Sequence, residues 1–384
     1  MRTSEKDLDL KNNKIIIVPP NGENIAQDFA LQRIVSFLKS KNLKTYLLQI
    51  DNKYNNKMYT DYVINVNSRN EIIDYLKRND FDLIIHRSWM HRYAFAAELA
   101  EEFDNIIVYI KDWHNYPKEK YKFIYKTEED FLGIEKLFKS GKQILTHFTD
   151  EQYKVWAERY NISGKYFSFF PEYCTKENFC INKQNQYDKY NPTLVMAGTL
   201  SATSEPSLIP GKSFYRKVKE ITNCNIEVNV VLLSKFYDLV QTDDRYKDYM
   251  YEDMFNDYFS IKLGKEMDPT ILEGYDFGIF NDTFYGCELI NYAEHYEYAV
   301  ISRLVLYLEA GLPIIVNKSM KAIANIVKEH KIGIIFEDGD VVEFDKIINL
   351  SQENYKQMVE NVYTYREIFS YNEETMKPIL EMLK

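Results

Sequence analysis

Short apolar runs alternate with longer amphipathic stretches along most of the chain. The runs have the length of buried strands, and the stretches between them repeat apolar residues at helical spacing. The predicted strands of the first half are 14–18, 45–50, 82–86, 105–110, 143–147 and 166–170. Those of the second half are 193–198, 226–233, 258–263, 276–281 and 314–316. Strands that alternate with helices predict an α/β fold with two Rossmann-like, doubly wound parallel sheets.

A polar stretch without periodicity separates the two series, so that the chain is predicted to have five parts. Residues 1–13 form a flexible tail, 14–170 a first Rossmann-like domain, and 171–191 a linker. Residues 192–350 form a second Rossmann-like domain, and residues 351–384 are helical. The length of 384 residues suits two domains of ordinary size.

The most informative stretch is 298–317, which predicts an amphipathic helix, a glycine stop and a buried strand. Gly311 stands where a left-handed residue ends a helix, and Pro313 prevents the helix from continuing. Ser302 and Arg303 lie near the first helical turn, where unpaired N–H groups and the helix dipole attract anions. This combination predicts a cradle for a diphosphate. The alternative is a capped helix start exposed to solvent.

Charge and cysteine content narrow the classes of function. The 48 basic and 58 acidic residues give a net charge of −10, which argues against nucleic acid as a partner. The four cysteines show neither a CxxC pair nor metal-site spacing, so we expect reduced thiols, with a Cys174–Cys180 disulfide as the alternative. No apolar run is long enough to span a membrane, and the first residues are polar. We expect a cytoplasmic protein; peripheral association with the inner face of the membrane stays open.

The stretch around Arg303 also resembles a known family. Ser302, Arg303, Tyr307 and the run 310–316 are similar, in order and spacing, to the nucleotide-sugar half of bacterial GT-B glycosyltransferases of the group 1 type. The resemblance is strong over residues 276–345 and loose before them.

The sequence departs from the common pattern of this family at two positions. Leu306 stands where many members carry a ribose-binding Glu, and Tyr298 stands where a second Glu is common. Glu309 is near in sequence but would point to another side of the helix. The segment 302–311 is therefore most similar to the galactofuranosyl- and glucosyltransferase-like branch.

The resemblance implies two domains that face each other across a cleft. The second domain would bind the nucleotide sugar and the first the acceptor, with the C-terminal helices crossing back to the first domain. The implied reaction moves a sugar from a nucleotide donor, expected to be a UDP-sugar, to a saccharide, lipid-linked or protein acceptor in bacterial surface glycan synthesis. The nucleotide sugar is a co-substrate; no other cofactor is expected. No Asp-x-Asp motif follows a predicted strand, so we expect no obligatory metal.

Ligands of open parallel sheets bind at the carboxyl ends of the strands. The candidates after the first strand of the second domain are Gly198, whose backbone can approach a phosphate, and the hydroxyls of Thr199 and Ser201. An ordinary glycine at the end of a strand is the alternative. By resemblance, Lys212 would supply a cation. The resemblance also assigns Glu297 and Tyr298 to the loop that touches the donor sugar, where the alternative for Glu297 is a solvated charge.

The first domain offers candidates for a general base, which an inverting transferase requires near the acceptor hydroxyl. Asp112 and His114 follow the strand 105–110 and are the first candidates, and His86, at the end of another predicted strand, is the second. Each of them has a structural role as its alternative.

Two other functions stay open. The chain is either a nucleotide-sugar epimerase or hydrolase on the same fold, which needs no acceptor, or a non-catalytic glycosyltransferase-like partner protein, which the missing Glu pair would fit. The sequence predicts neither the oligomeric state nor retention against inversion.

Overall fold

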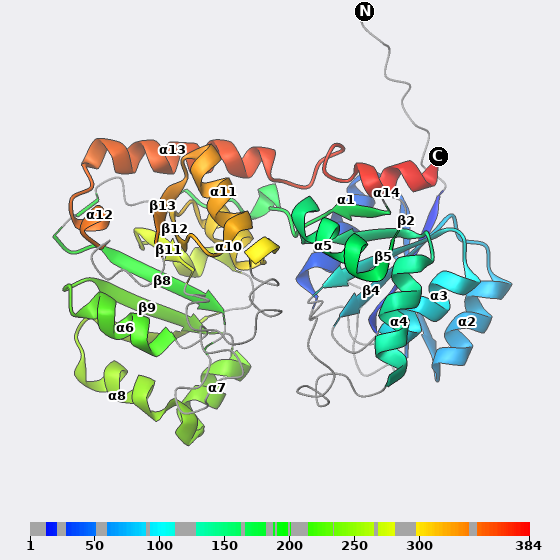
Figure 1. Ribbon diagram of the computed structural model, residues 1–384, viewed down its shortest axis with the longest axis horizontal. Helices are drawn as coiled ribbons and strands as arrows, with labels where there is room; N and C mark the ends of the chain where they lie inside the picture. The colour runs from blue at the N-terminus through cyan, green and yellow to red at the C-terminus, as the bar shows by residue number, and fades with distance from the viewer. Residues whose placement is uncertain are drawn as a thin grey trace, which may run out of the picture. The chain divides into compact units, whose positions relative to one another are not determined.

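The structure is a computed structural model of the 384-residue chain. It describes residues 13–20, 28–50, 60–89, 93–111, 128–162, 166–181, 187–188, 190–198, 200, 214–232, 234–264, 268–280, 297–337 and 344–384. The chain forms two compact units (Figure 1). The first unit comprises residues 1–170 together with 371–384, and the second unit comprises 171–370.

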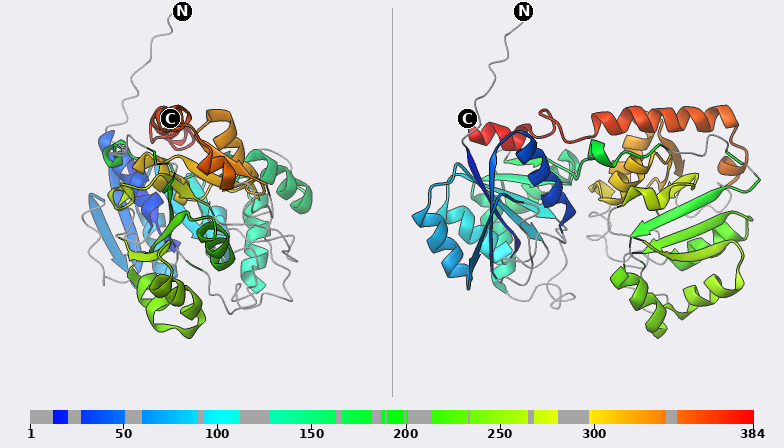
Figure 2. Two further views of the ribbon diagram at one scale, coloured as in Figure 1. Left: turned by 90° about the vertical axis from the view of Figure 1, so that its left-hand side faces the viewer. Right: turned by 180° about the vertical axis from the view of Figure 1, so that it is seen from behind.

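The described part of the first unit contains a seven-stranded parallel sheet with the order β3-β2-β1-β4-β5-β6-β7. The strands are β1 (Lys14–Val18), β2 (Lys44–Ile50), β3 (Tyr62–Val66), β4 (Leu83–Trp89), β5 (Ile106–Lys111), β6 (Gln143–Thr146) and β7 (Phe167–Phe169). The helices are α1 (Phe29–Ser40), α2 (Arg69–Arg78), α3 (Tyr93–Glu102), α4 (Glu128–Lys139), α5 (Asp150–Tyr160), α14 (Lys377–Leu380) and the 3-10 helix η9 (Glu381–Leu383). Helices cover both faces of this sheet (Figure 2).

The described part of the second unit contains a six-stranded parallel sheet with the order β10-β9-β8-β11-β12-β13. The strands are β8 (Thr193–Gly198), β9 (Glu227–Leu232), β10 (Phe259–Leu263), β11 (Phe277–Ile279), β12 (Ile314–Asn317) and β13 (Gly333–Phe336). The α-helices are α6 (Phe214–Thr222), α7 (Ser234–Thr242), α8 (Lys247–Phe255), α10 (Arg303–Ala310), α11 (Lys321–His330), α12 (Asp345–Ile348) and α13 (Gln352–Ile368). Three 3-10 helices are η4 (Lys176–Asn178), η6 (Asp244–Tyr246) and η7 (Pro269–Leu272).

Each sheet reverses its winding direction once. In the first unit, the chain builds from β1 through β2 to β3 on one side and then returns to place β4 on the other side of β1. In the second unit, β8 has the same position between β9 and β11. The neighbouring strands at such a reversal send their connections to opposite faces of the sheet, which leaves a crevice at their carboxyl ends. The fold therefore provides room for ligands at the carboxyl ends of β1 and β4 and at the carboxyl ends of β8 and β11. We call these two places the β1/β4 edge and the β8/β11 edge.

A threonine and an aspartate join neighbouring strands in both sheets. Asp61 accepts hydrogen bonds from the backbone N–H and the hydroxyl of Thr45 at 2.8 and 2.9 Å. Asp276, directly before β11, accepts the same pair of bonds from Thr193, at 2.8 and 2.9 Å. The second pair fixes β11 against β8 at the amino ends of the strands.

The segment before the second sheet and the helix after it both belong to the second unit. Residues 171–181, predicted as part of a linker, are attached there by a bridge between Cys174 and Ser370 and by a hydrogen bond from the Cys180 N–H to the Glu309 carbonyl. Helix α13 packs against α10 and α11, and only residues 371–384 join the first unit. Helix α13 buries apolar side chains in the second unit, and residues 371–384 are the part of the predicted C-terminal segment 351–384 that belongs to the first unit.

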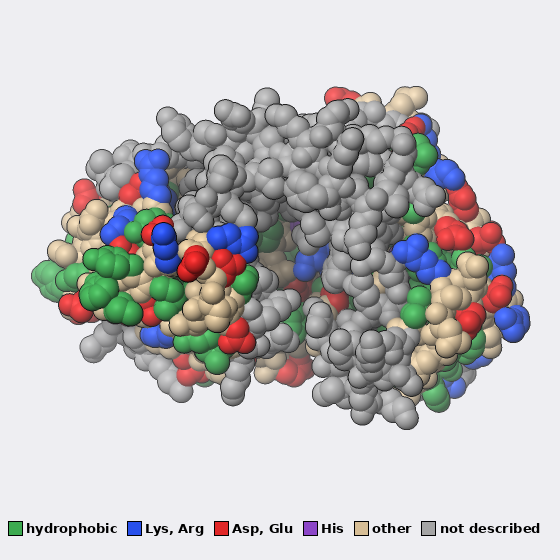
Figure 3. All heavy atoms as spheres, turned by 90° about the horizontal axis from the view of Figure 1, so that it is seen from below, with side chains coloured by type: hydrophobic (Ala, Val, Ile, Leu, Met, Phe, Trp, Pro, Cys, Tyr) green, Lys and Arg blue, Asp and Glu red, His purple; other side chains and the backbone are tan. Residues whose placement is uncertain are grey.

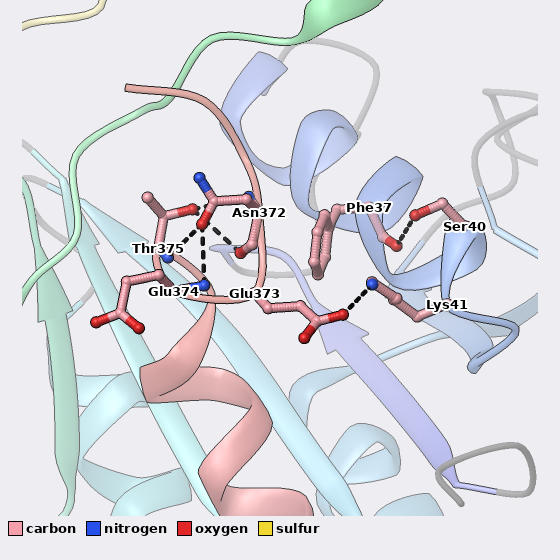
Figure 4. Close-up of polar contacts among 7 residues, drawn as sticks. All are labelled: Phe37, Ser40, Lys41, Asn372, Glu373, Glu374 and Thr375. Atoms are coloured by element: carbon pink, nitrogen blue, oxygen red, sulfur yellow. Dashed lines mark hydrogen bonds and ion pairs between the residues drawn. The ribbon is translucent and has the colours of Figure 1, made fainter. Parts of the chain in front are cut away.

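The final segment is held to the first unit by polar and apolar contacts. Glu373 forms an ion pair with Lys41 at the end of α1 (Figure 4). Asn372 accepts hydrogen bonds from the backbone N–H groups of Glu374 and Thr375, at 2.9 and 3.0 Å, which shapes the turn before α14 (Figure 4). The side chains of Met376 and Ile379 are fully buried.

Helix α8 shows two different sides. Tyr249 and Glu252 face the core of the second unit, whereas Tyr251, Met254 and Phe255 are exposed by 61%, 70% and 66%. Figure 3 shows a group of hydrophobic side chains at the left of the view, on the second unit. Within the described residues, no helix is long and apolar enough to span a membrane.

Candidate donor-binding site

Helix α10 ends where the sequence predicts, and it begins within the stretch 298–317 that was predicted to start with a helix. It begins at Arg303, after Ser302, and Gly311 ends it in the left-handed region with φ at 76°. A Cβ atom at Gly311 would lie 2.7 Å from Cε1 of Tyr363 on α13, so both the backbone angle and the space favour glycine. Pro313 then leads into β12, which is fully buried. The helix thus has a fixed position between the sheet and α13.

Tyr307 attaches α10 to the sheet. Its ring lies on Gly278 of β11, where a Cβ atom would be only 2.4 Å from the ring carbon Cγ. Its hydroxyl accepts a hydrogen bond from the Ala197 N–H at 3.1 Å and donates to the Ile279 carbonyl at 2.9 Å, with the Val195 carbonyl at 3.2 Å. The hydroxyl therefore bridges β8 and β11 where the sheet reverses.

Arg303 lies one helical turn before Tyr307 and reaches the carboxyl end of β8. Its Nη2 and Nε atoms are 3.5 and 3.7 Å from the position that a Cβ atom would take at Gly198, whose φ is 120°. Its Cζ atom is 5.8 Å from the centre of the Phe280 ring, just after β11. The structure therefore brings together two predicted site residues, Gly198 and Arg303, that are more than a hundred positions apart. A guanidinium beside a backbone without a side chain is suited to bind a phosphate group.

Ser302 is at the N-terminal end of the same helix. Its backbone is helical, and its side chain makes no capping hydrogen bond to the helix. Its backbone carbonyl accepts hydrogen bonds from the N–H groups of Val305 and Leu306 in the first turn of the helix. The predicted contact of its hydroxyl with a diphosphate stays a prediction.

Glu297 and Tyr298 lie together at the start of α11. The Glu297 carboxylate forms an ion pair with Lys321, the first residue of α11, and this bond raises the pKa of Lys321. The Lys321 ammonium also lies 5.5 Å from the centre of the Tyr298 ring. The ion pair orients the Glu297 carboxylate before any ligand binds. A sugar hydroxyl that binds Glu297 would share the carboxylate with the Lys321 ammonium.

The two positions near the missing ribose carboxylate have structural roles. Leu306 is almost completely buried. Glu309 is fully buried and accepts hydrogen bonds from the Thr175 N–H at 2.7 Å and from Asn178 Nδ2 at 3.5 Å. It holds the segment before the second sheet onto α10 and does not face the β8/β11 edge.

The structure corrects the prediction for His86. The predicted strand ended at this residue, but β4 continues to Trp89, and His86 pairs with Val18 on one side and Val108 on the other. Its ring is completely buried against Phe95, and its Nδ1 donates a hydrogen bond to the Val18 carbonyl, 2.9 Å away. Burial lowers the pKa of His86 to about 4. A neutral imidazole inside the core is a poor candidate for a base that acts on an acceptor hydroxyl.

The remaining predicted site residues lie outside the described residues. These are Asp112 and His114 in the first unit and Thr199, Ser201 and Lys212 in the second.

Sequence reasoning missed two arrangements. The first is the contact of Tyr307 with both strands at the reversal. The second is a buried ion pair in the first unit, in which Arg87 Nε lies 2.9 Å from the carboxylate of Asp28, the N-cap of α1. The Arg87 guanidinium also stacks on Tyr109, at 3.7 Å from the ring centre. An aspartate directly before the first helix was the available signal for the ion pair; for Tyr307 the sequence showed an aromatic residue in a helix and no sign of its partners.

Solved structures with the same fold cover nearly the whole chain. A glycosyltransferase from Rickettsia africae is 14% identical, with a TM-score of 0.66, and the match covers 97% of this chain and 98% of that chain. HepE from Anabaena, in complex with UDP and glucose, is 10% identical, with a TM-score of 0.63 and coverage of 97% and 99%. A TarM mutant from S. aureus, in a complex that includes UDP, is 9% identical, with a TM-score of 0.63 and coverage of 97% and 100%. The fold is that of GT-B glycosyltransferases.

A family comparison gives a more particular likeness. Residues 246–380 match the family described as Glucosyltransferase 3-like, C-terminal domain. This part of the chain contains Arg303, Tyr307 and Gly311. No curated protein matches the chain. The predicted fold, a GT-B fold with two Rossmann-like parallel sheets, is confirmed.

Proposed function

We propose that the chain transfers a sugar from a UDP-sugar to an acceptor hydroxyl, and that the donor diphosphate binds at the β8/β11 edge. The observation that supports this most strongly is the guanidinium of Arg303 beside Gly198 at the carboxyl end of β8. Glycine leaves room for a phosphate oxygen near the backbone, and arginine offers paired donors to it. HepE and TarM carry UDP in their solved complexes, which supports UDP as the nucleotide.

The chemistry of this site follows from the charge of the leaving group. When the glycosidic bond to the nucleotide breaks, negative charge grows on the diphosphate. The positive end of α10 and the Arg303 guanidinium can stabilise that charge without a metal ion. In our proposal the Ser302 hydroxyl, Thr199, Ser201 and Lys212 add contacts to the nucleotide.

Glu297 and Tyr298 are proposed to contact the donor sugar. The ion pair with Lys321 holds the Glu297 carboxylate in place, and its oxygens can accept hydrogen bonds from sugar hydroxyls.

The acceptor side is proposed on the resemblance of the sequence alone. The first unit would bind a saccharide, lipid-linked or protein acceptor in the synthesis of a bacterial surface glycan. Asp112 or His114 would act as general base in an inverting reaction. We propose that the protein works in the cytoplasm, at or near the inner face of the membrane.

The test removes the cation of the proposed site. We expect Arg303→Ala to weaken UDP binding at least about tenfold, since a hydrogen bond to a charged group contributes about 1.5–3 kcal/mol. Titration calorimetry on the full chain measures the change, with and without EDTA. Arg216→Ala is the control, because Arg216 is exposed on α6 and its ion pair is with Glu220. If Arg303→Ala binds UDP and turns over as the parent does, this donor site is wrong.

Activity without an acceptor separates the alternatives. Sugar release from UDP-sugars at the same rate with and without acceptors would point to a hydrolase. UDP binding with no turnover of any sugar donor would point to the non-catalytic partner protein.

A further inference from the structure

We propose that Tyr307 is a positioning residue of the donor site, which holds α10 where Arg303 can meet the diphosphate. The proposal rests on the proposed function, because it assigns to Tyr307 an effect on donor binding that acts through Arg303.

The first step is the opening between β8 and β11. The two strands pair only at Leu194 with Phe277 and at Val195 with Gly278, and β11 ends one residue later, at Ile279. Beyond that point β8 continues to Gly198 without a partner strand on this side, within the described residues. The backbone groups that face the opening need another partner, because an unpaired buried N–H is costly.

The Tyr307 hydroxyl is that partner. It accepts a hydrogen bond from the Ala197 N–H on β8 and donates one to the Ile279 carbonyl on β11. One oxygen atom therefore links the backbones of the two strands at the point where they separate. Ala197 and Ile279 are almost completely buried. A buried hydroxyl with partners on two strands fixes both the distance and the rotation of the helix that carries it.

The second step is the packing of the Tyr307 ring against β11. Gly278 is the residue under the Tyr307 ring, and no larger side chain fits there. Phe280 meets the ring edge-on from the other side, with centroids 5.4 Å apart and planes at 80°. The ring therefore contacts the residue before and the residue after the end of β11, which leaves α10 little freedom to slide along the strand.

The third step connects the packing of the Tyr307 ring to the position of the Arg303 guanidinium. Arg303 and Tyr307 are four positions apart on α10, so their side chains lie on the same side of the helix. The guanidinium extends past Phe280 to Gly198, one residue beyond Ala197, which binds the Tyr307 hydroxyl. A shift or rotation of α10 at Tyr307 would move Arg303 away from the end of β8. Small displacements of this kind weaken the binding of a group that must be held by directed hydrogen bonds.

The variant Tyr307→Phe removes the hydroxyl and keeps the ring on Gly278. We expect the dissociation constant for UDP, measured by titration calorimetry on the full chain, to rise about three- to tenfold. The matched control is Tyr355→Phe, because the Tyr355 hydroxyl is equally buried and donates to the Asp276 carbonyl, at 3.1 Å, at the amino end of β11. Both variants lose one buried hydroxyl bonded to the same segment, so we expect a loss of thermal stability in both and weaker UDP binding only for Tyr307→Phe.

A double-variant cycle shows whether Tyr307 acts through Arg303. In the Arg303→Ala background we expect Tyr307→Phe to have no further effect on UDP affinity, because the group that it positions is absent. Three results would overturn the proposal: unchanged affinity in Tyr307→Phe, an equal loss in Tyr355→Phe, or additive losses in the double variant. The proposed function fails separately, if Arg303→Ala alone leaves UDP affinity unchanged.

Discussion

At the scale of single residues, burial decides which side chains are poised for chemistry and which serve the fold. The two threonine–aspartate pairs illustrate this. Burial raises the pKa of Asp276 to about 6, against the lowering effect of its hydrogen bonds from Thr193, and among the described residues its Oδ1 atom has no hydrogen-bond partner. Partial burial of Asp61 raises its pKa less than the Thr45 bonds and Lys39 lower it, so the net shift is downward. The same motif therefore favours the neutral carboxyl in one sheet and the charged one in the other.

The difference predicts opposite pH effects on stability. The folded pKa of Asp276, about 6, is above the unfolded value of about 3.9, so the folded state binds more protons between these values. The contribution of Asp276 is therefore present below about pH 4 and lost as the pH rises to about 6. In Asp276→Asn, which keeps an oxygen for Thr193, we expect the stability relative to the parent to improve by roughly 2–3 kcal/mol over this range.

Thermal unfolding of the parent and of Asp276→Asn, from roughly pH 3.5 to roughly pH 7.5, measures this effect, because that interval includes both pKa values. The control is Asp61→Asn, where the lowered pKa gives stability above the unfolded value that is lost as the pH falls. The expected curve for that variant therefore changes in the opposite direction. Parallel pH curves for the parent and Asp276→Asn would contradict the prediction.

At the scale of elements, the site depends on how closely α10 approaches the sheet. Gly278 lets the Tyr307 ring lie on β11, and the Glu309 carboxylate on the opposite part of the helix binds the backbone of Thr175. From the side of α13, Arg366 donates to the carbonyls of Glu309 and Cys180 at 3.1 and 2.7 Å. The helix is thus held by the sheet, by the segment before the sheet and by α13 together.

The close approach makes Gly278→Ala a sensitive change. The added methyl group would lie 2.4 Å from the Tyr307 ring, so either the ring or the helix must move. We expect a loss of about 1–3 kcal/mol in stability, typical of overpacking, together with weaker UDP binding because Arg303 moves with the helix. Chemical denaturation and calorimetry measure the two effects. If the variant has the stability and the UDP affinity of the parent, the Tyr307 ring does not pack closely on residue 278.

At the scale of the whole molecule, one unit is formed by a continuous segment of the chain and the other by two separate segments. The second unit is continuous, from Pro171 to Ser370, whereas the first unit recruits its last part from the C-terminus. That last part contributes buried side chains, Met376 and Ile379, and a hydrogen bond from Asn13 Nδ2 to the Leu383 carbonyl at 3.3 Å. The first unit therefore cannot be complete before residues 371–384 have been synthesised.

Deletion of residues 371–384 tests this division. We expect the first unit to lose several kcal/mol of stability, because burial of one large apolar side chain contributes about 1.5–3 kcal/mol. The second unit should still be stabilised by UDP, which calorimetric unfolding with and without UDP can follow. Glu373→Gln is the control: its ion pair with Lys41 is largely exposed, and we expect a change below about 1 kcal/mol. A deletion that leaves the first unit unchanged would contradict the assignment of this segment.

The sequence by itself determined the features that depend on neighbouring residues. The alternation of apolar runs and amphipathic stretches gave both parallel sheets, and Gly311 followed by Pro313 gave the end of α10 and the start of β12. The edge strand β3 was missed, because its half-exposed residues mix polar and apolar side chains. The signature around Arg303 was enough to predict the GT-B fold, since the spacing of residues within one helix and one strand carries that signature.

Tertiary structure alone decided which residues meet. The predicted strand ended at His86, before the polar Arg87, but Arg87 forms an ion pair with Asp28, 59 positions away, so β4 continues through it and His86 lies in the core. The Tyr307 hydroxyl meets Ala197 across 110 positions, and Arg303 meets Gly198 at the same edge. Local periodicity contains no information on such contacts, because they depend on the order of the strands and on the distance between a helix and its sheet. The sequence determined the helix that carries the cation, and the packing of that helix against β8 and β11 decided where the cation lies.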